Sequence, residues 1–427
     1  MGIIAGYREW PVYTEDLATT PGRIFKSVLT YLAISLGAVL IAAIGAEIYL
    51  EHRAAPRLPL PFYNVLYPYV MFRPNESYTY ITQETYEMSH NKSRVIFYSN
   101  EDGFRIPSAG YKLPKEKPAG QLRIAVLGGS LVELASTYEL TLPGSLKTLL
   151  QRRYPGRDIE VINAGIQSAV SRQSLVQFLV TVADYHPDIV ILYDGGNDIG
   201  LPFTYESRPN FPYNFQTMEE AWNLYREEHR EPLWRIALDR SYLFRTVRSR
   251  FDPSQKDFIP TADDPFAGTN RIPVERVISD HSLVVNQISA YLSNWRKLVE
   301  LSQAYHFQPV CILTPAEAGL DPNYAMPRMM TSFHLDRQAA LQWVRAFQLL
   351  YDEAGSEIDE LRRAYPRVTF LNLTHFLQPS EKYFWDLAHL YDEANMDVAE
   401  KIYTEIRPKI EAELESAKRS PSPEATR

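Results

Sequence analysis

Four short groups of glycine and polar residues stand out because each follows an apolar run typical of a buried strand. The first three are GGS at 128–130, AG at 164–165 and GGND at 195–198. The fourth lies beyond the last apolar run and contains Asp386 and His389. The carboxyl ends of parallel strands meet along one edge of a sheet, so we expect these groups to lie close together.

The types of these residues fit acyl transfer through a serine. A serine hydroxyl is a poor nucleophile unless a neighbouring base removes its proton, and an imidazole with an intrinsic pKa of about 6.5 suits that task. Asp386 precedes His389 by three positions, so its carboxylate can turn back within one loop and hold the imidazole tautomer. Ser130, His389 and Asp386 therefore predict a catalytic triad.

Structural alternatives exist for each residue. Ser130 can cap a helix, Gly165 can serve a tight turn, and Asp386 can cap the helix that follows it. Asn197 and Asp198 can form a turn or a cap. A phosphate-binding loop at 128–130 is a further alternative, and it would make this a nucleotide-binding domain. The sequence GGSLVELAS has neither the third glycine nor the lysine of the common phosphate loops.

In order, the four groups resemble the sequence blocks of the SGNH hydrolase superfamily, also called the GDSL family of esterases and lipases. Residues 128–131 resemble the Gly-Asp-Ser-Leu block, 195–198 match Gly-x-Asn-Asp, and 386–389 match Asp-x-x-His. The resemblance implies that Ser130 is the nucleophile, His389 the base and Asp386 its orienting carboxylate. It implies no metal and no organic cofactor.

The same resemblance implies an oxyanion hole for the tetrahedral intermediate. Its donors would be the backbone N–H groups of Ser130 and Gly165 and the side-chain amide of Asn197. Two positions depart from the family pattern: Gly129 stands where the named motif has Asp, and Ser168 stands where many members have a second glycine.

The periodicity predicts an α/β fold. Apolar runs alternate with helical patterns in a chain of 427 residues that is 45% hydrophobic. This alternation is typical of a doubly wound parallel sheet, so we expect a three-layer α/β/α domain with a five-stranded, flavodoxin-like sheet. The single cysteine, Cys311, is expected in the core of the fourth strand. The expected strands are 123–127, 160–163, 188–193, 309–313 and 368–373, and the expected helices are 142–153, 171–184, 277–305, 335–364 and 392–414.

The N-terminal part predicts a membrane anchor. Residues 28–46 carry no charge and are about long enough to span a bilayer as a helix, although a cleaved signal peptide is an alternative. We expect an arm at 1–24, a transmembrane helix at 25–50 and a stalk with a small β element at 51–120. The SGNH-like domain would follow at 121–414, with an insertion at 199–274 and a disordered tail at 415–427.

The net charge and its distribution limit the kinds of partner that the chain is expected to bind. The net charge of −8 and pI of about 5.7 give no basic surface for nucleic acid. Basic residues lean slightly toward the N-terminal side of the span, which predicts that the main domain faces outward. The expected function is a membrane-anchored serine esterase or O-acyltransferase acting on a cell-envelope glycan or lipid. The alternative is a non-catalytic accessory subunit that docks against other membrane proteins.

Overall fold

The computed structural model describes residues 21–53, 63–66, 69–72, 74–80, 95–204, 207–211, 241, 243–244, 247 and 272–419. The predicted arm before residue 21, most of the predicted insertion and the chain after Arg419 lie outside the described residues. The chain divides into two compact units. One comprises Met1–Pro56 and Glu231–Lys256, and the other comprises Arg57–Arg230 and Asp257–Arg427.

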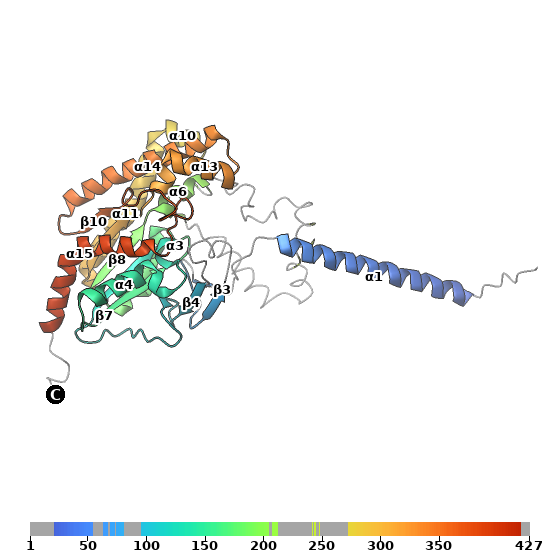
Figure 1. The fold of residues 1–427 in the computed structure, drawn as a ribbon, viewed down its shortest axis with the longest axis horizontal. Coiled ribbons are helices and arrows are strands. Elements are labelled where there is room, and N and C mark those ends of the chain that lie inside the picture. Colours follow the sequence, from blue (N-terminus) through green and yellow to red (C-terminus); the bar gives the residue numbers. More distant parts are fainter. Residues whose placement is uncertain are drawn as a thin grey trace, which may run out of the picture. The chain divides into compact units, whose positions relative to one another are not determined.

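The first unit contains the long helix α1 (Pro21–Arg53), which Figure 1 shows as one uninterrupted helix. Its segment Val28–Tyr49 is 22 residues long with a mean hydropathy of 2.3, and none of its most apolar window is buried. The helix is therefore long and apolar enough to cross a membrane. Near its end, the carboxylate of Glu47 accepts hydrogen bonds from Ser241 Oγ at 2.9 Å and Leu243 N at 2.8 Å.

The second unit is built on a parallel sheet whose five strands lie where the sequence predicts them. They are β6 (Leu122–Gly128), β7 (Ile159–Gly165), β8 (Ile189–Asp194), β9 (Gln308–Leu313) and β10 (Thr369–Asn372). Their spatial order is β10-β9-β8-β6-β7. Strand order reverses on either side of β6, which is the flavodoxin-like switch point where ligands bind in open α/β sheets.

The sheet is wider than the predicted five strands. Beyond β7 it continues through β5 (Arg105–Ile106), β4 (Val95–Ser99) and β3 (Ser77–Tyr80), all antiparallel, so it has eight strands in the described part of the chain. A separate hairpin pairs β1 (Tyr63–Leu66) with β2 (Tyr69–Phe72). The error arose because these strands are short and mix polar with apolar residues, a pattern that does not reveal which sheet they join.

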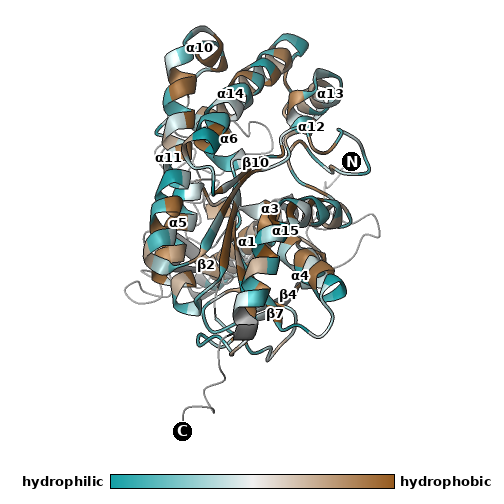
Figure 2. Ribbon diagram, turned by 90° about the vertical axis from the view of Figure 1, so that its left-hand side faces the viewer, coloured by the Kyte–Doolittle hydropathy of each residue, from teal (hydrophilic) through white to brown (hydrophobic). Residues whose placement is uncertain are grey.

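Alternating side chains give the sheet two apolar faces. In β6, Ala125 and Leu127 pack on one face, and Ile124 and Val126 pack on the other. The first face is covered by α5 (Ser171–Val180), α11 (His281–Tyr305) and α14 (Arg337–Ala364), and the second by α4 (Leu142–Arg153) and α15 (Ala394–Arg419). Figure 2 shows the strands between these two layers of helices. Cys311 is fully buried in β9, as predicted.

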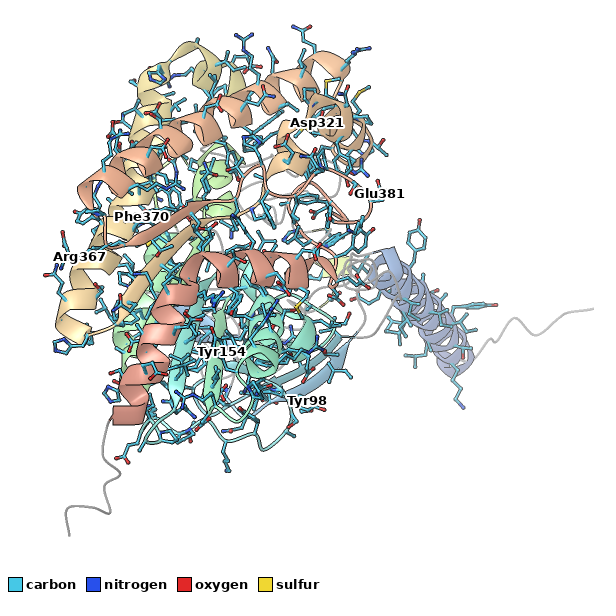
Figure 3. The ribbon with its side chains drawn as sticks, turned by 60° about the vertical axis from the view of Figure 1, so that its left-hand side comes forward. Tyr98, Tyr154, Asp321, Arg367, Phe370 and Glu381 are labelled. Carbon is cyan, nitrogen blue, oxygen red and sulfur yellow. The ribbon has the colours of Figure 1, made fainter. Side chains whose placement is uncertain are left out.

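Aromatic packing and helix caps complete the domain. Phe370 of β10, labelled in Figure 3, stacks against Trp295 of α11 with ring centroids 6.0 Å apart. The predicted helix at 277–305 is broken at Asp280, whose carboxylate caps α11 by accepting from Ser282 N at 3.1 Å. Helix α15 continues to Arg419, past the predicted end at residue 414. The other α-helices in the described part of the chain are α3 (Ser130–Glu133), α6 (Gly196–Thr204), α10 (Val274–Ser279), α12 (Glu317–Leu320) and α13 (Pro322–Ser332).

Gly128 ends β6 where the backbone of β8 approaches closely. A Cβ atom there would lie 2.0 Å from Tyr193 O, whereas a Cβ at Gly196 would meet no atom closer than 3.9 Å. Gly128→Ala should therefore lower the free energy of unfolding by about 3 kcal/mol or more, and Gly196→Ala should change it little. Urea unfolding of the full chain in mild detergent measures both, and equal stabilities would contradict the close approach.

Candidate active site

Ser130 lies at the first turn after β6. The N-cap position of α3 is occupied by Gly129, and no side chain caps this helix. Ser130 is therefore not the helix cap that the alternative interpretation predicted. Instead, Ser130 Oγ lies 2.8 Å from His389 Nε2. The backbone N–H of Ser130 opens α3, where no earlier helical carbonyl can accept it.

His389 and Asp386 share the loop between β10 and α15, on which Figure 3 labels Glu381. Asp386 Oδ1 accepts from Ala388 N at 2.7 Å and from His389 N at 2.6 Å, so the carboxylate is fixed by its own loop. Asp386 Oδ2 lies 2.6 Å from His389 Nδ1. An ionised carboxylate only accepts hydrogen bonds, so Nδ1 carries the proton and Nε2 is left to accept from Ser130.

The charge state of Asp386 suits this arrangement. Burial alone would raise the pKa of its carboxyl, but the charge and hydrogen bonds of His389 outweigh burial and lower the pKa below its usual value. Asp386 therefore stays ionised at neutral pH. The structure brings together the three residues predicted as a triad, and their catalytic roles remain predictions.

Asn197, the predicted side-chain donor, lies beside the nucleophile turn. It follows β8 at the start of α6, and its Nδ2 donates to Ala169 O at 2.9 Å. A Cβ at Gly129 would lie 2.8 Å from Asn197 Nδ2, so this amide reaches the residue next to Ser130. The bond to Ala169 uses one of two amide hydrogens, and the other is available to an oxyanion.

Gly165, predicted as an oxyanion donor, lies at the end of strand β7. Its N–H donates to the side chain of Asn163 at 3.1 Å, and β7 extends through Gly165, which pairs with Gly128. The loop starts later than the sequence pattern suggested. Within it, Ser168 adopts a left-handed backbone with φ of 58°, and among the described residues its N–H has no hydrogen-bond acceptor.

Ser168, rather than Gly165, therefore has a backbone N–H that is not used by an acceptor in the described part of the chain. The carbonyl oxygen of the neighbouring Ala169 accepts from Asn197 Nδ2 and would lie 3.3 Å from a Cβ at Gly129. This loop therefore lies against the nucleophile turn. The sequence did hold a signal for this position. Ser168 stands where the family pattern has a second glycine, and a position with positive φ usually holds glycine. Trp385 was also not predicted, and its ring stacks on that of His389 at 5.1 Å and 18°.

Two buried carboxylates lie beneath the site and hold its supporting helices. Asp198 accepts from Ser171 N at 3.0 Å and from Ser171 Oγ at 2.5 Å, and so caps α5; burial raises its pKa to about 6. Asp194 accepts from Tyr291 OH at 2.8 Å and Trp295 Nε1 at 3.1 Å. The cap alternative for Asp198 is thus observed. No cluster of three or more metal-ligating side chains occurs among the residues that the structure describes.

Comparisons with known proteins add little beyond the fold. No family model matches the sequence, and no curated protein matches it. The acetylxylan esterase Axe2 from Geobacillus stearothermophilus shares 15% identity over 68% of this chain and 95% of that chain, with a TM-score of 0.32. An alpha/beta hydrolase enzyme from the metagenome of Lake Arreo, Spain, shares 13% identity over 67% and 95%, with a TM-score of 0.29. Similarities this weak carry no inference about substrate.

Replacing Asp386 by Asn should destabilise the protein in a pH-dependent way. An acid whose folded pKa is lowered stabilises the fold above its unfolded pKa of about 3.9, and this contribution is lost as the pH falls through the folded pKa. The difference in unfolding free energy between wild type and Asp386→Asn should thus be at least as large at pH 5 as at pH 7, and smaller below pH of about 4. Urea unfolding at several pH values measures it. A difference that already shrinks between pH 7 and 5 would mean that burial dominates.

Gly129→Ala should weaken the site without unfolding the domain. The added methyl would push Asn197 Nδ2 away, and loss of one oxyanion donor typically costs about 10²–10³-fold in rate. We expect slower hydrolysis of a p-nitrophenyl ester, with a much smaller change in urea stability. Gly200→Ala is a matched control, since its Cβ would meet no atom closer than 3.4 Å. Unchanged hydrolysis in Gly129→Ala would show that Asn197 is not needed at its observed position.

Proposed function

We propose that this chain is a membrane-anchored serine esterase or O-acyltransferase of the SGNH type, working through an acyl-serine intermediate. The observation that supports it most directly is the continuous hydrogen-bonded series Ser130 Oγ, His389 Nε2, His389 Nδ1 and Asp386 Oδ2. Such a series converts a weak hydroxyl into a nucleophile.

The reaction follows from the positions of these groups. His389 Nε2 takes the proton of Ser130 as Oγ attacks the ester carbonyl, and Asp386 stabilises the imidazolium that forms. The amide of Asn197 and the N–H groups of Ser130 and Ser168 donate to the oxyanion. The imidazolium then protonates the departing alcohol, leaving an acyl group on Ser130. An incoming hydroxyl, deprotonated by His389, releases that group.

The acceptor separates an esterase from an acyltransferase. Water yields a free acid, and a sugar hydroxyl yields a new ester. Anchoring through residues 28–46 with the main domain on the outer side would keep the site close to lipids and cell-envelope glycans, so we propose one of these as the substrate. No step in this scheme requires a metal or an organic cofactor.

A fluorophosphonate probe tests the proposal because it reacts only with an activated serine. The full chain in mild detergent should be labelled at Ser130. Ser130→Ala should abolish labelling, and His389→Ala should slow it by about 10³-fold or more. Ser145→Ala, which changes another buried serine, should be labelled like wild type. A wild-type protein that is folded but not labelled, and that co-purifies with a large membrane complex, would instead favour the accessory-subunit function.

A further inference from the structure

The segment that follows the nucleophile helix is held by strands outside the five-stranded parallel core. Arg105 of β5 donates from Nη1 to Glu133 O at 2.5 Å and from Nη2 to Ala135 O at 2.9 Å. Ile96 N of β4 donates to Ser136 O at 2.8 Å. Arg105, Glu133 and Ser136 are each 1% exposed, so these contacts are shielded from water.

Ser136 in turn holds the loop that carries the histidine. Its N–H lies 3.2 and 3.3 Å from the two carboxyl oxygens of Asp392, and its hydroxyl donates to Asp392 Oδ2. Asp392 is 2% exposed and lies three residues after His389. A second tie follows, because Asn395 Nδ2 donates to Leu140 O at 2.9 Å.

These contacts can fix the position of the His389 imidazole, which its hydrogen bond to Ser130 alone cannot do. The stability gained from a single hydrogen bond between partly exposed groups is smaller than the conformational entropy lost when several loop residues are ordered. The bond from Ser130 therefore cannot itself fix the position of the imidazole. Several buried hydrogen bonds to one carboxyl group, anchored through Arg105 to the sheet, can fix it.

We propose that Ser136 and Asp392 are positioning residues, which set the place of the His389 imidazole against Ser130. This inference rests on the proposed serine chemistry. It assigns the antiparallel strands a part in that chemistry, because β4 and β5 fix the segment 133–136 from which Asp392 is held. Misplacement by about 1 Å can lower a rate by about 10²-fold.

The first test compares fluorophosphonate labelling rates in full-length variants. Asp392→Ala should lower the rate by about 10–10²-fold, and Ser136→Ala should lower it less because the backbone N–H contacts remain. Asp392→Asn keeps an acceptor for that N–H and should recover much of the rate. Ser145→Ala, whose hydroxyl contacts Glu139 O at 3.4 Å, is the matched buried-serine control and should keep the wild-type rate.

The second test places the same changes in a His389→Ala background. If Asp392 acts through the imidazole, Asp392→Ala or Ser136→Ala should hardly slow the residual labelling once the imidazole is gone. Equal fold-losses in both backgrounds would overturn the proposal and make the role purely structural. The proposal would also be overturned if Ser136→Ala, Asp392→Asn and Asp392→Ala were all labelled at the wild-type rate. Failure of the proposed function looks different, since the wild-type chain would then not be labelled at all.

Discussion

The hydrogen bond between Ser130 Oγ and His389 Nε2 is the contact on which the proposed function depends, and it joins residues far apart in the sequence. Ser130 follows β6, whereas His389 follows β10, which lies three strand positions away in the sheet. At about 4.8 Å per strand the loop after β10 must return roughly 14 Å across the carboxyl edge. The crossing delivers the imidazole to the switch point beside β6. The domain therefore has to position this loop as firmly as it positions the sheet.

Helix α15 helps to hold the loop that carries His389 in its position across the edge of the sheet. It begins at Ala394 and packs with α4 over the face of the sheet that includes Ile124 and Val126. In the loop before it, the stretch 384–392 is held at both ends. Tyr324 OH donates to Phe384 O at 3.0 Å, and Ser136 N donates to Asp392. Between these ties the loop closes on itself through Trp385 N and His389 O at 3.2 Å. Asp386 therefore orients the imidazole from within a stretch that is hydrogen-bonded to the rest of the domain at Phe384 and at Asp392.

The parts of this architecture that were predictable are those encoded in apolar runs. Strands such as β6 and β8 are buried at every residue. Apart from Arg123 in β6 and Asp194 at the end of β8, their sequences are apolar segments that run into glycines. The geometry of parallel sheets then predicted that polar residues following those segments lie close together, and Ser130 and His389 are hydrogen-bond neighbours. In contrast, β5 is two residues long and contains a buried arginine, which sequence patterns assign to solvent. Gly165 was predicted to follow β7, but β7 continues through it to pair with Gly128.

The buried polar groups around the site make directional contacts that the apolar core does not. Replacing buried ionic groups by well-packed apolar residues is often neutral or stabilising, yet Arg105, Glu133 and Asp392 are all nearly inaccessible to solvent. Apolar contacts are non-directional and would let the segment after α3 settle in several positions. Hydrogen bonds from Arg105 to the carbonyl groups of Glu133 and Ala135 favour a single position of this segment. The chain thus combines an apolar sheet, which any suitable pattern of strands would supply, with directional contacts at the corner where the segments that carry Ser130 and His389 meet.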